Sequence, residues 1–221
     1  MINTLVISDI HLGSSVCDRD KVLQILSTPF KTLIINGDLF DNHSFKRYNK
    51  KDWKILSKIR KLSKTHSVIL VKGNHDGCAD FLAAITGMEF VSEYSFTIDN
   101  MKYHCEHGDA YDHWIKYKPI STFIFTGIYY WIQKFDKRHI ITRRLKAWSK
   151  SWVKAKDLVS RRFLDKRGGS YDVLIAGHTH YPETIYSRAA CCYYVNTGSF
   201  CDERCSYVVI SDDGSFDLKY I

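Results

Sequence analysis

The sequence lacks the cysteine spacing that builds zinc knuckles or disulfide-rich secreted domains. Its seven cysteines are an odd number, and no two of them form a Cys-x-x-Cys pair. They are scattered at positions 17, 78, 105, 191, 192, 201 and 205. This pattern is typical of reduced and mostly buried thiols, so we expect a cytoplasmic protein without a disulfide framework.

Segments that would carry the chain into or across a membrane are also missing. The first apolar run is not preceded by a charged region, an apolar core and a cleavage site, so no secretory signal is predicted. The apolar run at 123–132 is about half as long as the roughly 20 residues of a membrane-spanning helix. With no internal repeats, the 221 residues predict a single domain, 1–221, that carries one insertion.

Positive charge is concentrated in one segment of the chain, although the formal net charge is +8. Between Trp114 and Arg167, fifteen Lys and Arg residues stand against three acidic residues, a balance of +12 that leaves about −4 for the remainder. The same segment is rich in aromatic residues and predicts two or three amphipathic helices ending at Gly168-Gly169. We therefore expect a helical insertion over about residues 110–168 that faces an anionic partner.

Short apolar runs alternate with helical patterns early in the chain. Buried strands are predicted at 2–8, 31–36 and 67–71, and helices at 18–27, 50–63 and 79–86. All-apolar strands in such an alternation indicate an α/β sheet covered by helices on its faces. Later runs predict β-hairpins of a second sheet stacked on the first, at 94–98, 101–107, 183–187, 191–197, 205–211 and 215–221.

Five clusters of side chains that can bind metal each follow an apolar run. They are Asp9-Ile10-His11, Gly37-Asp38-Leu39-Phe40-Asp41, Gly73-Asn74-His75-Asp76, His107-Gly108-Asp109 and Gly177-His178-Thr179-His180. In sheets covered by helices, functional residues gather just past the carboxyl ends of the strands. Hydrolysis of a phosphate ester at neutral pH is served by two divalent ions roughly 3.5–4 Å apart. Ligands for such a pair are supplied by Asp9, His11, Asp38, Asn74, His107, His178 and His180.

In this order, the motifs Asp-x-His, Gly-Asp-x-x-Asp, Gly-Asn-His-Asp, His-Gly-Asp and Gly-His-x-His resemble those of the calcineurin-like metallophosphoesterase superfamily. The resemblance runs from Asp9 to His180 and implies a four-layer α/β/β/α sandwich. It implies that the first metal is held by Asp9, His11 and His180. It also implies that Asp38 bridges the two metals and that the second is held by Asn74, His107 and His178.

The same resemblance implies roles for the other motif residues. His75 would face the substrate and stabilise the phosphoryl charge or protonate the leaving oxygen, with Asp76 orienting its ring. Asp41 and Asp109 would accept hydrogen bonds from ligand side chains. The implied cofactor is a pair of divalent ions, Mn²⁺ in the first place, with Fe²⁺ or Zn²⁺ as alternatives that the same ligands suit.

The insertion after His107 is similar to the helical cap of the UDP-2,3-diacylglucosamine pyrophosphohydrolases, which implies cleavage of a UDP-linked acylated glucosamine to lipid monophosphate and UMP. Acyl chains would lie in a slot lined by Phe123, Phe125, Tyr129, Tyr130 and Trp131. Basic residues, Arg143 and Arg144 among them, would face the pyrophosphate or an anionic membrane surface. The same residues also fit a simpler role, in which the aromatic face packs onto the body and the charges face solvent.

Two other functions stay open. A basic insertion that grips a phosphate backbone would make the protein a nucleic-acid or nucleotide phosphodiesterase. His75 stands where the lipid-A hydrolases usually carry Arg, and this leaves the lipid substrate open to question. The second alternative is a binding scaffold that kept the fold and lost catalysis, which the complete ligand set argues against. No protein partner is predicted.

Overall fold

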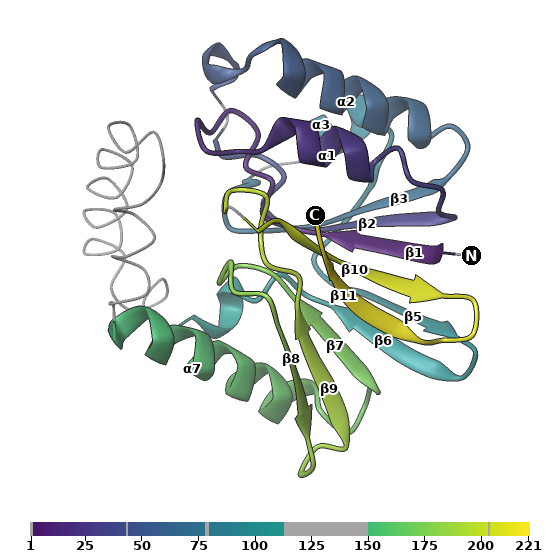
Figure 1. Ribbon diagram of the computed structural model, residues 1–221, viewed down its shortest axis with the longest axis vertical. Helices are drawn as coiled ribbons and strands as arrows, with labels where there is room; N and C mark the ends of the chain where they lie inside the picture. The colour runs from purple at the N-terminus through teal and green to yellow at the C-terminus, as the bar shows by residue number, and fades with distance from the viewer. Residues whose placement is uncertain (1, 43, 78–79, 113–149, 203) are drawn as a thin grey trace.

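Two β-sheets stack face to face, with helices on both outer faces (Figure 1). The computed structural model describes residues 2–42, 44–77, 80–112, 150–202 and 204–221. One sheet is covered by helices α1 (Arg19–Ile25), α2 (Lys50–Leu62) and α3 (Asp80–Thr86), and the other by helix α7 (Lys150–Arg167). This is the four-layer α/β/β/α sandwich that the sequence predicts.

Parallel strands form the centre of the first sheet, whose order is β11-β10-β1-β2-β3-β4. The parallel strands are β1 (Ile2–Ile7), β2 (Thr32–Asn36), β3 (Ser67–Val71) and β4 (Glu89–Val91). A hairpin of β10 (Ser206–Ser211) and β11 (Phe216–Tyr220) extends the sheet, with β10 antiparallel to β1. The carboxyl ends of β1, β2 and β3 therefore lie side by side at one edge.

The second sheet has the order β5-β6-β7-β9-β8. Its strands are β5 (Tyr94–Ile98), β6 (Met101–Cys105), β7 (Val173–Ala176), β9 (Cys192–Asn196) and β8 (Glu183–Ser187). Strands β6, β7 and β9 are parallel, and β5 and β8 pair antiparallel at the two edges. The carboxyl ends of β6 and β7 also lie next to each other.

Two sequence predictions about the sheets are corrected. The runs 205–211 and 215–221 form strands, but they belong to the first sheet and not to the second. Strand β10 lies between β1 and β11 and packs Val208 and Ile210 between the sheets and Val209 toward the helices, so both of its faces are buried. The short strand β4, after helix α3, was not predicted because Glu89 is exposed and the other two residues are only partly buried.

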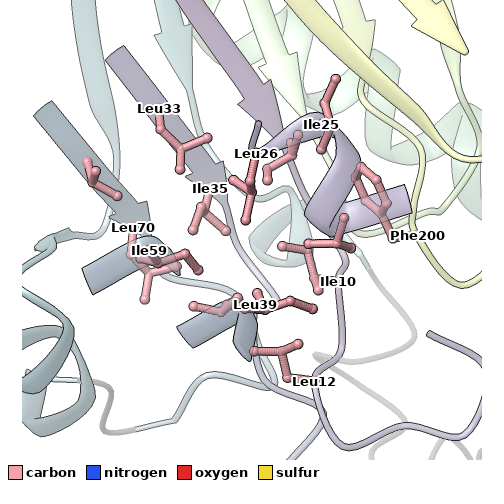
Figure 2. Close-up of a cluster of buried hydrophobic side chains, with 14 of the residues drawn as sticks. Ile10, Leu12, Ile25, Leu26, Leu33, Ile35, Leu39, Ile59, Leu70 and Phe200 are labelled. Carbon is pink, nitrogen blue, oxygen red and sulfur yellow. The ribbon is translucent and has the colours of Figure 1, made fainter. Parts of the chain in front are cut away.

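Successive side chains of the central strands are all buried but point alternately toward the helices and toward the other sheet. In β1, Leu5 and Ile7 point toward α1 and α2, and Val6 points into the layer between the sheets. The helix-side layer continues past the strand ends as Ile10, Leu12 and Leu39 (Figure 2). These side chains anchor the segments that carry the polar motifs.

The insertion is described only at its two ends. The 3₁₀ helix η2 (Asp109–Tyr111) opens it, and α7 closes it at Arg167, directly before Gly168-Gly169 as predicted. The residues predicted to bind substrate, from Phe123 to Arg144, lie outside the described residues. Within the described part of the chain, no helix has the length and apolarity needed to cross a membrane.

Candidate metal centre

All predicted ligands lie just beyond the carboxyl ends of parallel strands. They follow β1, β2, β3, β6 and β7, and they are Asp9 with His11, Asp38, Asn74, His107, and His178 with His180. Backbone pairing continues past β1 and β2, where the amide of His11 donates to the carbonyl of Asp38 at 3.0 Å. The pairing holds the first two motifs in register while Ile10 and Leu12 point into the core.

Five of the ligands have a left-handed backbone conformation. The φ angles are 49° at Asp9, 50° at His11, 54° at Asp38, 66° at His178 and 55° at His180. Asp and His adopt this region more readily than most residues, but at a cost on the order of 1 kcal/mol or more each. The turn at each strand end thus directs the side chain toward the centre, and this strain is held by the surrounding core.

Three glycines make room for ligands that belong to other motifs. A Cβ built on Gly37 would lie within 3.0 Å of the His107 ring, and one on Gly73 within 3.0 Å of the Asp38 carboxylate. A Cβ on Gly177 would meet the carboxylate of Asp9 in the same way. The glycine that opens each of these motifs is therefore required by close approach of a neighbouring strand end.

The first group of ligands is formed by Asp9, His11 and His180. The Nε2 atoms of the two histidines lie 3.2 Å apart, and His180 Nε2 lies 3.1 Å from Asp9 Oδ1. These three donor atoms lie within 4.8 Å of one another. The other carboxylate oxygen of Asp9 accepts hydrogen bonds from Ser8 and from the His178 amide, so Oδ1 is left facing the histidines.

Asp38 lies between the two groups of ligands. Its Oδ2 atom is 3.7 Å from His11 Nε2 and 3.3 Å from His107 Nε2, while Oδ1 accepts a hydrogen bond from the His75 amide at 2.9 Å. The His178 ring lies 5.4 Å from the His107 ring, and its Nδ1 atom lies 3.1 Å from Oδ1 of Asn74. This arrangement suits the bridging role expected of Asp38.

A pair of divalent ions fits the donor set. Asp9 Oδ1 and His107 Nε2 are buried and have no hydrogen-bond partner of good geometry among the described residues. Buried polar atoms are rarely left unpaired, because each costs about 1–3 kcal/mol. Carboxylate, imidazole and amide donors are those that bind Mn²⁺, Fe²⁺ or Zn²⁺.

The electrostatics of the centre set the protonation of its ligands. Burial lowers the pKa of His11 to about 4, so this imidazole is neutral at pH 7 and one of its two ring nitrogens has a lone pair for a metal. Burial also opposes the charge of His107, but the Asp38 carboxylate beside it outweighs that effect and holds the pKa of His107 well above its usual range. In turn, His107 and His11 hold the pKa of Asp38 well below its usual range despite burial.

The structure corrects the orientation of His75. Asp76 was predicted to orient its ring, but both Asp76 oxygens accept backbone hydrogen bonds, from Gly73, Asp38 and Phe40. Asp76 therefore ties the β2 and β3 motifs together. The His75 ring is held instead by the carbonyl of Asp41, which accepts from Nδ1 at 2.9 Å, and it stands edge-on to His11 at 4.8 Å between centroids.

The two other predicted acceptors behave differently from expectation. The Asp41 carboxylate lies beside His11 but at 3.8 Å from Nδ1, and its Oδ2 atom pairs with Arg47 in η1 (Phe45–Arg47) and accepts a hydrogen bond from Asn42. Asp109 lies in η2, and the contact with a ligand is made by Asp112 instead, at 3.0 Å from His178 Nε2. Asp112 was missed because one Asp in a turn carries no signal by itself.

Comparison with known proteins agrees with this site. The sequence profile of the family described as calcineurin-like phosphoesterase matches residues 2–182. A search of curated proteins finds no relative that matches the chain. Among solved structures, Vps29 from Chaetomium thermophilum has a TM-score of 0.52 at 13% identity and covers 99% of this chain and 95% of its own.

Two further solved structures are similar to the chain at comparable sequence identity. A single mutant of Vps29 from Entamoeba histolytica has a TM-score of 0.50 and 16% identity, covering 99% of this chain and 97% of its own. YfcE, a phosphoesterase from E. coli, has a TM-score of 0.49 and 19% identity, and covers 98% of this chain and 97% of its own. At these identities, the likeness to the Vps29 structures shows a common fold.

The family match covers most of the chain, so the chain belongs to the calcineurin-like phosphoesterase family. The protein is a metal-dependent phosphoesterase. The family acts through two metal ions, and the clustered Asp and His side chains are candidate groups for holding them.

Proposed function

We propose that the protein hydrolyses the pyrophosphate of a UDP-linked acylated glucosamine, releasing a lipid monophosphate and UMP. The observation that supports this most is the position of α7, the last helix of the basic insertion. Val159 and Phe163 of this helix are fully buried, in one cluster with Tyr111 of η2. Lys156 donates a hydrogen bond at 2.8 Å to Glu183, just after the His180 motif. The insertion therefore ends beside both halves of the metal centre.

The rim next to His180 presents an aromatic ring together with a cation. Lys156 Nζ lies 4.0 Å from the centroid of the Tyr181 ring, and Tyr181 is 48% exposed. An exposed ring suits a nucleotide, because a base can stack on it. Tyr181, held by Lys156, therefore supports a nucleotide-linked substrate.

In the proposed reaction, two divalent ions would supply positive charge to the phosphoryl oxygens and acidify the attacking water. The chain itself contributes His75. Its Nδ1 donates to a carbonyl oxygen and must carry a proton, so Nε2 is the nitrogen that gains or loses one. Protonated His75 would donate from Nε2 to the leaving oxygen as its bond to phosphorus breaks.

The test compares UDP-2,3-diacylglucosamine with single-stranded DNA, using the purified protein with Mn²⁺. We expect turnover of the glycolipid, and we expect Trp131→Ala to lower it while leaving hydrolysis of a small aryl phosphodiester unchanged. Fast hydrolysis of DNA without turnover of the glycolipid would establish the alternative, a nucleic-acid phosphodiesterase. A protein inert toward all three substrates with every divalent ion tried would point to a binding scaffold.

We also propose that the basic insertion contacts an anionic membrane surface, since each Lys or Arg near such a surface contributes about 1 kcal/mol of attraction. Co-sedimentation with phosphatidylglycerol vesicles, but not with phosphatidylcholine vesicles, is the expected result. Equal recovery in both pellets would contradict this part of the proposal.

A further inference from the structure

Asp112 contacts a predicted metal ligand from outside the five motifs. Its Oδ2 atom lies 3.0 Å from Nε2 of His178, and the side chains of Asp112 and His178 are 14% and 9% exposed. An ionised carboxylate only accepts hydrogen bonds, so Nε2 of His178 carries the proton directed at Asp112, and Nδ1 is the nitrogen that would bind a metal. Nδ1 lies 3.1 Å from Oδ1 of Asn74, the other ligand at this side of the centre.

The turn that carries Asp112 begins immediately after the ligand His107. Gly108 has a φ of 110°, which reverses the chain at once, and the next residues form the 3₁₀ turn η2. The amide of Asp112 donates to the carbonyl of Asp109 at 3.0 Å and closes this turn. Asp112 is thereby returned toward the strand end that carries His178.

Helix α7 holds this turn from outside. Arg162 Nη1 donates to the carbonyl of Tyr111 at 3.1 Å, and the Tyr111 ring stacks on Phe163 at 4.9 Å between centroids. The hydroxyl of Tyr111 donates to Glu106 at 2.8 Å, and Glu106 also lies 3.4 Å from Arg167 Nε. Helix α7 thus contacts the turn through Arg162 and Phe163, and its neighbour Glu106, next to His107, through Arg167.

We infer that Asp112 is a positioning residue for the second metal: it fixes the ring orientation and tautomer of His178, and α7 fixes Asp112. The end of the insertion is thereby coupled to the metal centre. This inference rests on the metal-dependent function of the protein, but it does not depend on the substrate proposed above. A carboxylate that holds a ligating histidine typically changes metal affinity by about 10–100-fold.

The test is calorimetric titration of metal-free protein with Mn²⁺ alone, without substrate. We expect Asp112→Ala to weaken binding of one of the two ions by about 10–100-fold and to leave the other unchanged, while Asp112→Glu restores part of the loss. Asp165→Ala, which removes an exposed carboxylate from α7, is the matched control and should bind both ions like the wild type. Long-range ¹⁵N correlation spectra of histidine should show the Nε2-protonated tautomer of His178 in wild type and its loss in Asp112→Ala.

Wild-type affinity for both ions in Asp112→Ala, with the His178 tautomer unchanged, would overturn the inference.

Arg162→Ala removes the hydrogen bond to the carbonyl of Tyr111, and we expect it to weaken binding of the same ion that Asp112→Ala affects. Unchanged affinity in that variant would overturn the role of α7. A wild-type protein that binds no ion would contradict the metal-dependent function itself, which is a separate and recognisable result.

Discussion

Gly73 carries no side chain because the Asp38 carboxylate and amide occupy the space beside it. We predict that Gly73→Ala pushes Asp38 out of its bridging position and weakens Mn²⁺ binding at least about tenfold, at a cost of about 1–3 kcal/mol in unfolding free energy. Calorimetry and urea denaturation measure the two effects. The neighbouring Lys72 is exposed, so Lys72→Ala should change neither. Wild-type metal affinity in Gly73→Ala would contradict the predicted role of Asp38.

Binding of metal should release a proton from His107. The Asp38 carboxylate raises the pKa of His107, so this imidazole stays protonated at neutral pH in the metal-free protein. A metal must displace that proton, and its affinity should therefore rise with pH until the raised pKa of His107 is passed. Titrations at one pH in two buffers of different ionisation enthalpy give the number of protons released. A value of zero near neutral pH would contradict this prediction.

The same pKa shift has a consequence for stability without metal. Because the folded-state pKa of His107 is raised, its pairing with Asp38 stabilises the fold fully below the unfolded pKa of about 6.5. That contribution is lost as the pH rises through the raised pKa. At higher pH, a bound metal ion would take the place of the proton that His107 has lost.

At the residue scale, the sequence predicts which side chains meet but not how they are held. The ligands could be named because five motifs in order carry a strong pattern, and the structure brings all of them to one edge. The holding contacts could not be foreseen. Asp112 meets His178 across 66 positions of the chain, and the carbonyl of Asp41, which holds His75, belongs to no side-chain pattern. The left-handed φ angles of the ligands also depend on the assembled core.

At the scale of elements, Asp52 joins helix α2 to the loop after the His11 motif. Its Oδ1 atom accepts from Arg19 at 2.7 Å and from the Gly13 amide, and its Oδ2 atom completes a capping box with Asn49. Asp52 is fully buried. The Asp52 side chain therefore caps the start of α2 and also fixes the segment between His11 and α1.

We predict that Asp52→Ala lowers the free energy of unfolding by about 3–5 kcal/mol, because it leaves a largely buried guanidinium without its partner. Asp20→Ala is the matched control, since the ion pair of Asp20 with Lys51 of the same helix is exposed and contributes less than about 1 kcal/mol. Urea denaturation of the two variants measures the difference. Equal losses would show that burial of the Arg19 pair does not matter.

The positions of helices and strands follow from apolar periodicity, but their pairing does not. Helix α2 was predicted within a residue of its observed end because its buried face repeats clearly. The hairpin of β10 and β11 was predicted as strands and placed in the wrong sheet. The apolar pattern of a strand indicates that the strand is buried but not which strand it pairs with. Strands β1 and β10 are about 200 positions apart, so no local feature of the sequence indicates their pairing.

At the scale of the whole molecule, two stacked sheets bring five strand ends to one edge. Each sheet supplies part of the centre, with Asp9, His11, Asp38 and Asn74 from the first and His107, His178 and His180 from the second. The metal centre therefore requires the packed sandwich, and its ligands span most of the chain. Basic charge is concentrated in the insertion, and the last helix of the insertion contacts residues next to His107 and His180.

The most direct test of the central claim is hydrolysis of an aryl phosphodiester by chelator-treated protein as Mn²⁺ is added back. The account predicts activity that requires two ions per chain, and a His75→Ala variant that binds both ions but turns over about 10²–10⁴-fold more slowly. A wild-type protein that binds two ions and stays inert with Mn²⁺, Fe²⁺ and Zn²⁺, or a His75→Ala variant of full activity, would contradict it.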